Sequence, residues 1–234
     1  MLLSALALVL LGLPASSMWL RDIVHFYSAF NAYVPHSAGG SGPGSILVLG
    51  GGVEFSGVPG VFDLDLSGTD GVLIIKENAQ ALPAQMMAHL DQPAVAGQIN
   101  VSFDLGMLNG PSGLVVFVSD DDGGGMIDLV FDDQGRLRVG ASSVIELTGA
   151  PGSSEYALHA DLMLRQGLLG MNTWMLSLRT PNGTVVRSGV LSSVGPLSVG
   201  GVGVTRPGLS SGGTWRMDNL LVTSPVPGNA ASSQ

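Results

Sequence analysis

Short stretches in which apolar and polar residues alternate recur along most of the chain. In residues 99–105 (INVSFDL) every second residue is apolar, and residues 156–164 and 173–180 repeat this pattern. Successive side chains of a β-strand point to opposite faces, so this alternation places one face in a core and the other in water. The sequence therefore predicts many β-strands, each with one buried face.

Turn signals separate these stretches at short intervals. Asn182-Gly183 joins residues 173–180 to the apolar run that begins at Thr184, and residues 132–135 (DDQG) join two further apolar stretches. Gly and Asn adopt the positive φ angles that tight hairpins require. Frequent turns between short strands predict one all-β domain over residues 46–224, built as a two-sheet antiparallel β-sandwich.

Two stretches of this domain depart from strict alternation. Residues 113–118 (GLVVFV) form a continuous apolar run, which predicts a strand covered on both faces. Residues 78–90 are rich in Ala, Gln and Met and are interrupted by Pro83, so we interpret them as a loop with at most one turn of helix. Later strands are expected at residues 197–204 and 215–222.

The first residues have the layout of an export signal. Residues 1–20 are apolar and uncharged, and the small residues Ala15-Ser16-Ser17 favour cleavage after Ser17, so residues 1–17 are predicted to be a signal peptide. The alternative is an uncleaved membrane anchor, which Gly12 and Pro14 weaken. The prediction is a secreted or cell-surface protein that contacts membrane only through residues 1–20, if these remain.

Residues 18–45 are expected to form an aromatic segment followed by a linker. Five large apolar residues have helical spacing and predict a short amphipathic helix: Trp19, Ile23, Phe26, Tyr27 and Phe30. Residues 36–44 are rich in Gly and predict a flexible linker. Residues 225–234 are predicted to be a disordered tail.

Charge and cysteine content exclude several functions. The chain carries 9 basic and 18 acidic side chains, a formal net charge of −9, with no cluster of Lys or Arg. Nucleic acid is therefore excluded as a partner, because phosphate binding requires a basic surface. The absence of Cys excludes thiol catalysis and thiolate metal sites.

Several segments together resemble one fold family. They are residues 53–57 (VEFSG), 99–105 (INVSFDL), 127–139 (IDLVFDDQGRLRV), 173–178 (TWMLSL) and 215–222 (WRMDNLLV). In their order along the chain and their residue patterns, these segments resemble the concanavalin A-like lectin/glucanase (laminin-G-like) jelly-roll superfamily, over most of residues 46–224. The resemblance implies a jelly roll and a carbohydrate ligand, and the superfamily also contains glycoside hydrolases and polysaccharide lyases.

Paired carboxylates would support the enzymatic alternative. Asp63 and Asp65 share one strand face and are the nearest match to a hydrolase acid pair, but no Glu accompanies them. Convergence of these two residues with Asp104 or Glu146 in one groove would favour an enzyme. No residue is predicted to be catalytic on the sequence alone.

An acidic loop is the one candidate metal site. Asp120, Asp121 and Asp122 precede three glycines and offer oxygen ligands that suit Ca²⁺, so calcium is the only cofactor that the sequence suggests. The favoured alternative is a solvated turn, because Asp tolerates tight backbone angles. The four His residues show no zinc-binding spacing, and His159 is interpreted as a strand-face residue rather than a base. Trp174 and Trp215 are predicted core residues.

The functional prediction is a secreted or cell-surface binding or structural module that is not an enzyme. Its partner is expected to be a glycan or surface polymer, with calcium assistance if the acidic loop binds the ion. One alternative is a glycoside hydrolase or polysaccharide lyase of the same fold. Another is a passive extracellular matrix or assembly subunit, favoured if residues 18–36 dock on a neighbouring molecule.

Overall fold

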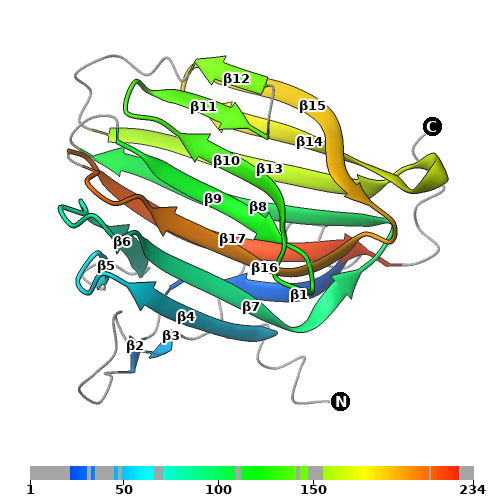
Figure 1. Cartoon of the computed structure of the whole chain (residues 1–234), viewed down its shortest axis with the longest axis horizontal. Helices are drawn as coiled ribbons and strands as arrows, with labels where there is room; N and C mark the ends of the chain where they lie inside the picture. The colour runs from blue at the N-terminus through cyan, green and yellow to red at the C-terminus, as the bar shows by residue number, and fades with distance from the viewer. Residues whose placement is uncertain are drawn as a thin grey trace.

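The chain folds into two antiparallel β-sheets that lie face to face (Figure 1). The computed structural model describes residues 22–30, 33–34, 45–46, 49–65, 71–108, 112–140, 143–146, 155–210 and 212–226. The prediction of an all-β sandwich is confirmed. The predicted signal peptide, most of the linker and most of the tail lie outside the described residues.

The eight-stranded sheet contains both ends of the described chain. Its strands are β1 (Asp22–Ser28), β5 (Phe62–Asp65), β6 (Val72–Ile75), β8 (Gln98–Leu108), β13 (Glu155–Gln166), β14 (Met171–Thr180), β15 (Gly183–Val194) and β17 (Thr214–Pro225). They follow the order β15-β14-β13-β8-β17-β6-β5, and β1 also pairs with β17. We call the outer surface of this sheet the back face.

The seven-stranded sheet lies toward the viewer in Figure 1. Its strands, in spatial order, are β12 (Ser143–Glu146), β11 (Arg136–Val139), β10 (Gly125–Phe131), β9 (Leu114–Ser119), β16 (Ser198–Arg206), β7 (Ala84–Val95) and β4 (Gly51–Gly57). We call its outer surface the front face. Two short strands, β2 (Tyr33–Val34) and β3 (Ser45–Ile46), form a separate pair.

The core lies between the two sheets and follows the predicted alternation. In β8, Ile99, Val101 and Phe103 are fully buried, whereas the residues between them are partly exposed. Trp174 and Trp215 are core residues, as predicted. The indole nitrogen of Trp215 donates to the Ser112 carbonyl at 3.1 Å, so its burial leaves no unpaired donor.

Both predicted hairpins are present. Thr180 pairs with Gly183 across the turn between β14 and β15, and Gly183 has φ 126°. The turn after β10 leads into β11, and its Gly135 has φ 74°. The strands expected near residues 197–204 and 215–222 are β16 and β17.

Two local predictions are wrong. Residues Asp22–Ser28 form strand β1 instead of a helix, because β17 supplies an antiparallel ladder, with one register shift between Val24 and Phe26, and the alternate residues Phe26, Ser28 and Phe30 become buried. Residues Ala84–Val95 form β7 instead of a loop, paired on both sides by β16 and β4. Among the described residues, the only helical turn is Leu168–Gly170, and no helix there is long and apolar enough to span a membrane.

Candidate functional site

An unusual row of side chains crosses the centre of the front face. Strand register places Asp128 of β10, Phe117 of β9, Gly203 of β16, Met87 of β7 and Glu54 of β4 side by side. We call these five residues the aromatic row. It has a ring near its middle and a carboxylate at each end.

The Phe117 ring lies flat against the sheet because β16 offers no side chain beneath it. A Cβ atom added to Gly203 would lie 2.0 Å from the Phe117 ring, so only glycine permits this position. Gly201 plays the same part for the neighbouring Met87, whose terminal methyl would lie 2.9 Å from an added Cβ. Val202 and Val204 point the other way and are fully buried in the core.

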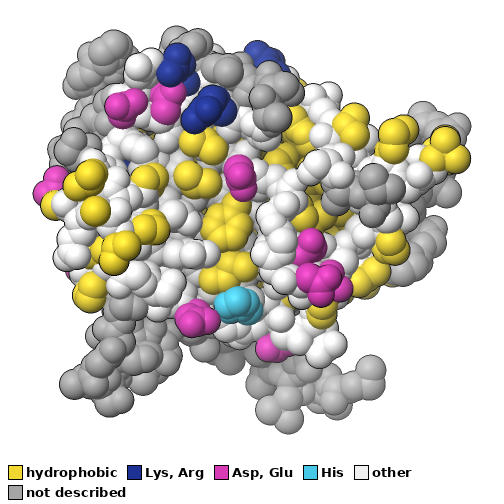
Figure 2. Space-filling view, in the orientation of Figure 1, with side chains coloured by type: hydrophobic (Ala, Val, Ile, Leu, Met, Phe, Trp, Pro, Cys, Tyr) yellow, Lys and Arg dark blue, Asp and Glu magenta, His cyan; other side chains and the backbone are white. Residues whose placement is uncertain are grey.

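Polar side chains border the aromatic row on the front face. One row away on one side, strand register places Gln85, Thr205 and Arg138, with Val115 and Val130 between Thr205 and Arg138. On the other side, His89 lies 3.5 Å from the Glu54 carboxylate, and both side chains are exposed. Figure 2 shows hydrophobic side chains at the centre of this face, with acidic side chains and a histidine around them.

The two carboxylates of the aromatic row are too far apart to act as the acid pair of a glycoside hydrolase. Asp128 and Glu54 are four strands apart, which corresponds to about 19 Å, whereas hydrolases need about 5 to 9.5 Å. Asp132 lies four residues beyond Asp128 along the chain, and its carboxylate is held by Arg136 at 2.8 Å. Asp128 and Glu54 therefore do not form a hydrolase acid pair.

The acidic loop is organised by its own backbone. The Asp120 carboxylate accepts hydrogen bonds from the backbone N–H groups of Asp122 and Gly124, at 3.1 and 2.6 Å. Asp121 and Asp122 are exposed. Within the described part of the chain, no three acidic or His side chains gather as they would around a metal ion. The backbone N–H groups hold the Asp120 carboxylate within its own turn, and calcium binding by this loop stays a prediction.

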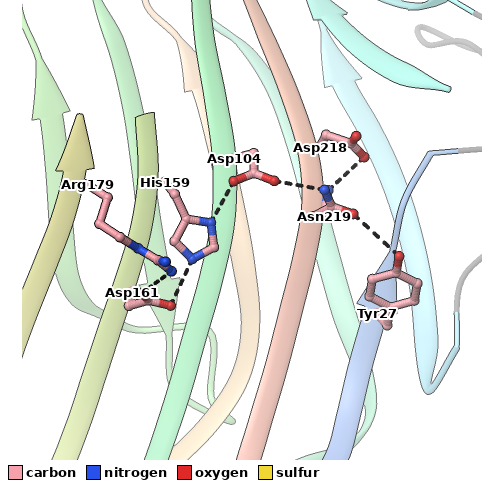
Figure 3. Close-up of polar contacts among 7 residues, drawn as sticks. All are labelled: Tyr27, Asp104, His159, Asp161, Arg179, Asp218 and Asn219. Carbon is pink, nitrogen blue, oxygen red and sulfur yellow. Dashed lines mark hydrogen bonds and ion pairs between the residues drawn. The ribbon is translucent and has the colours of Figure 1, made fainter. Parts of the chain in front are cut away.

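The back face carries a different kind of cluster, which Figure 3 shows. His159 of β13 lies between two carboxylates, with Nδ1 2.6 Å from Asp104 of β8 and Nε2 3.0 Å from Asp161. Arg179 of β14 contacts the other oxygen of Asp161 at 3.1 Å, and Asn219 of β17 donates to the other oxygen of Asp104 at 2.8 Å. With Tyr27 and Asp218, which both contact Asn219, these residues form the histidine network.

The histidine network shifts the protonation of its members. Hydrogen bonds to Asp104 and then to Asp161 raise the pKa of His159 to about 9. Burial raises the pKa of Asp104 and of Asp161 and is the largest single effect on each. The hydrogen bonds and positive charges around them together outweigh burial, from His159, Asn219 and Arg179 at Asp104 and from His159 and Arg179 at Asp161, and leave both pKa values below the ordinary range. At neutral pH, His159 is therefore a cation between two carboxylates. Neither Asp104 nor Asp161 is therefore held in its protonated form, as a general acid would be.

The other acids named in the sequence analysis do not converge. Asp63 pairs with Lys76 at 2.8 Å, and Asp65 pairs with Arg216 at 3.2 Å, both near the edge of the back face. Asp104 belongs to the histidine network. Glu146 lies in β12 of the opposite sheet, and its side chain is outside the described residues.

The sequence interpretation did not identify the aromatic row or the histidine network. Phe117 was assigned to a strand covered on both faces, but β9 alternates between buried and partly exposed residues. The signal that could have revealed the aromatic row is Gly201-Val202-Gly203-Val204, where glycine occupies every second position and leaves one face of the strand without side chains. His159 was correctly placed on a strand face, but its partner Asp104 is 55 residues away.

The strand order and the two packed sheets define a concanavalin A-like jelly roll, and solved structures share this fold. A lectin from Bauhinia forficata, in complex with GalNAc, is 10% identical with a TM-score of 0.51, over 74% of this chain and 93% of the lectin. An alginate lyase from Aplysia kurodai is 7% identical with a TM-score of 0.55, over 87% of this chain and all of the lyase. No family model and no curated protein matches the chain.

Proposed function

We propose that this protein is an exported carbohydrate-binding module that holds a glycan chain across its front face, with Phe117 as the central contact. The observation that carries the proposal is the aromatic row, a ring laid flat on an open sheet and bordered by polar side chains. The lectin that shares the fold was solved with a bound sugar, which supports the same ligand class.

The chemistry of the aromatic row suits a sugar ring. One face of a pyranose presents C–H groups, which pack on the electron-rich face of an aromatic ring. The hydroxyl groups at its edges need donors and acceptors, which Gln85, Thr205 and His89 supply from the neighbouring rows. Because several strands contribute, the row can contact successive residues of a polymer.

Binding is favoured over catalysis by the spacing of the acids. On the front face, Asp128 and Glu54 lie beyond the range of a hydrolase pair. On the back face, Asp104 and Asp161 have pKa values below the ordinary range, so neither is held protonated as a general acid would be. The passive-subunit alternative is favoured if residues 18–36 dock on a neighbouring molecule. Within this segment, Asp22–Ser28 pairs with β17 of the same chain, which gives that alternative no support.

Calcium assistance remains a prediction with a direct test. The Asp120 carboxylate already satisfies two backbone donors of its own loop, so an ion would have to compete with them. We expect glycan binding to be unchanged by a chelator. Loss of binding with chelator, restored by added Ca²⁺ and abolished by Asp121→Asn with Asp122→Asn, would establish the metal site.

The binding proposal is tested with a panel of immobilised polysaccharides and the full chain. We expect Phe117→Ala to weaken binding at least tenfold and Phe117→Tyr to retain it, since a tyrosine ring stacks in the same way. Val115→Ala, on the same face of β9, is the matched control and should bind like the wild type. Equal binding by wild type and Phe117→Ala, or no binding to any polysaccharide, would refute the proposal.

Export is part of the proposal and has its own test. Residues 1–17 lie outside the described residues, so support comes only from their sequence. Expression of the full chain in a secreting host, followed by N-terminal sequencing of the protein in the medium, should show a start at Met18. A protein that stays in the cell with its first residues intact would contradict export.

A further inference from the structure

One edge of the eight-stranded sheet is longer than the other sheet edges. Strand β15, in orange beside β14 in Figure 1, ends the strand order of this sheet and contains 12 residues. Among the other described edge strands, β5 and β12 contain four residues each, and β1 and β4 contain seven each. Short edges are protective, because the backbone groups of an edge can pair with a strand of another molecule. Of the described edges, β15 therefore offers the longest ladder to such a strand.

Strand β15 has few of the residues that protect an edge from pairing. It contains one charged residue, Arg187, and no proline. Its ladder to β14 is regular from Gly183 to Val190, without a bulge that would twist the edge away. Val186 and Val190 are 50% and 65% exposed on the back face. A regular strand with exposed β-branched side chains and little charge favours pairing with another strand, so the partner of this edge is an extended polypeptide.

The backbone groups of alternate β15 residues point away from β14. Thr180 and Gly183 are register partners across a two-residue turn, so the odd-numbered residues of β15 bond to β14. The Val186 carbonyl points outward and accepts a hydrogen bond from the Arg187 guanidinium at 2.9 Å. An antiparallel partner strand must place its own outward-pointing residues opposite the even-numbered residues of β15, which limits the possible registers.

The sequence of β15 is complementary to itself about Ser188. When a second copy pairs antiparallel with Ser188 opposite Ser188, each Val186 faces Val190 of the other copy. Each Arg187 then faces Gly189, so the two guanidinium groups are not directly opposite each other. Cross-strand pairs of β-branched side chains stabilise an antiparallel ladder, whereas like charges directly opposite destabilise it. This register therefore satisfies both conditions.

Registers shifted by one residue match less well. With Arg187 opposite Arg187, two like charges would face each other. With Gly189 opposite Gly189, Val186 would face Ser192 and Val190 would face Ser188, so neither valine would have an apolar partner. The register centred on Ser188 is the one in which apolar side chains face apolar side chains and no charges are opposed.

Apolar neighbours extend this match beyond β15. Met175 is the register partner of Ser188 and is 38% exposed, and Met163 is the next residue of the same row on β13. In the paired arrangement, the methionines of both copies flank the central serines on the back face. Neither β14 nor β15 contains an acidic residue, although the chain carries a net charge of −9. The contact therefore buries apolar surface without bringing carboxylates together.

We propose that two copies of this chain pair through β15 into a symmetric dimer, with one continuous sheet across both copies. The contact is isologous, with its two-fold axis at Ser188 and perpendicular to the sheet. Such an axis keeps each face of the sheet on one side, so the front faces of both copies point the same way. Two aromatic rows can then contact one polymer together, a consequence that rests on the front-face proposal, whereas the dimer does not.

Sedimentation velocity of the full chain, at concentrations between about 1 and 100 µM, tests the dimer. We expect a reversible equilibrium of monomer and dimer with a Kd of about 10 µM, as for a small symmetric interface. Ser188→Lys places two like charges opposite each other at the axis and should weaken dimerisation at least about tenfold. Ser56→Lys is the matched control, because Ser56 is also an exposed serine on an edge strand, and this variant should dimerise like the wild type.

Cross-linking tests the register, because the chain contains no Cys and each variant therefore has a single thiol. In the proposed dimer, the Cα atoms of the two Ser188 residues lie about 5.5 Å apart, within the range of a disulfide. The two Thr184 residues lie about 27 Å apart along the same edge. We expect Ser188→Cys to form a disulfide-linked dimer under mild oxidation and Thr184→Cys to stay monomeric.

These outcomes are separate from the test of the front face. Phe117→Ala should leave the sedimentation unchanged. Ser188→Lys should bind a soluble oligosaccharide like the wild type, but bind an immobilised polysaccharide about tenfold more weakly. The inference is overturned if the chain is monomeric over the whole concentration range, if Ser188→Lys dimerises like the wild type, or if Thr184→Cys cross-links as readily as Ser188→Cys. If Ser188→Lys does not fold, the two cysteine variants decide the question.

Discussion

The two outer faces of the sandwich are both open surfaces of antiparallel sheets, yet they use their side chains differently. On the back face, polar groups contact one another, as His159 does with Asp104 and Asp161 at 2.6 and 3.0 Å. On the front face, the central Phe117 lies on Gly203, and its polar neighbours are mostly presented to solvent. We expect the back face to contribute more to stability and the front face more to polymer binding.

This difference shows two ways in which side chains can be arranged on the exposed face of a sheet. Cross-strand pairs on an exposed face can stabilise the sheet, and a network of partly buried charges couples four strands together. An aromatic ring that lies over a glycine makes few polar contacts within the protein, so the outer face of the ring remains available to a ligand. The following predictions test this division between the two faces.

The largest difference should appear when the two histidines are compared. His159→Leu leaves Asp104 without its ion-pair partner and Asp161 with Arg179 alone, so we expect the free energy of unfolding at pH 6 to fall by about 2 kcal/mol. The matched front-face change, His89→Leu, removes a 3.5 Å contact between exposed side chains and should cost at most about 0.3 kcal/mol. Urea unfolding measures both, and equal losses would remove the contrast between the faces.

The same cluster should make stability depend on pH. The pKa of His159 is raised from 6.5 to about 9, so its contribution is fully present below pH 6.5 and is lost as the pH rises through 9. Because the side chain is 31% exposed and partly screened, we expect a loss of about 1 to 2 kcal/mol over this interval. Asp104 and Asp161 have lowered pKa values, so their contribution is lost only as the pH falls below 3.8.

Urea unfolding between pH 5 and pH 10 measures this dependence, with His159→Leu as the control. The variant should lack the decline between pH 6.5 and 9 that the wild type shows. A wild-type midpoint that stays constant over this interval would show that His159 is not held as a cation by its two carboxylates.

A smaller effect on stability is expected at the centre of the front face. Phe117 is partly exposed, so Phe117→Ala should lower the free energy of unfolding by about 1 kcal/mol, well below the 3 to 5 expected for a buried phenylalanine. Its effect on polysaccharide binding should be the larger one. A loss of several kcal/mol on unfolding would mean that the aromatic row is a structural element and that the faces are alike.

The smallest expected loss of stability tests whether the length of an ion pair or its burial determines its contribution on the back face. Lys76 lies 2.8 Å from Asp63, nearly as close as His159 lies to Asp104, but both side chains of the Lys76–Asp63 pair are about half exposed. We expect Lys76→Met to change the free energy of unfolding by only about 0.3 kcal/mol. A loss comparable to that of His159→Leu would show that proximity, rather than burial and networking, determines the contribution.

The sequence predicted the fold better than it predicted either site. Period-two alternation identified β8, β13 and β14, and turn residues identified the hairpins at Asn182 and Gly135, because both signals are local. Strand β7 was missed because the outer-face Met87 interrupts the alternation of its buried residues Ala84, Met86 and Ala88. Strand β1 was missed because its apolar residues also fit a helical period, and only the distant β17 decides between the two.

The sites were harder to predict because they depend on neighbours across strands. Phe117, Gly203 and Met87 are adjacent only through the ladders of three strands, from distant parts of the chain. The same holds for Asp104 and His159, which no spacing rule connects. Each residue appeared in the sequence as an ordinary member of a strand, and strand register, which single-strand patterns do not reveal, gave it its partners.

The pairing of β1 with β17 has a practical consequence. Asp22 and Pro225 are register partners, so the first and last described residues of the sandwich are neighbours in one ladder. A short peptide linker could join these positions, and new ends could be opened at the exposed Asn182 turn to give a circular permutant. Cargo fused before residue 22 or after residue 225 would be attached at the same place on the sandwich.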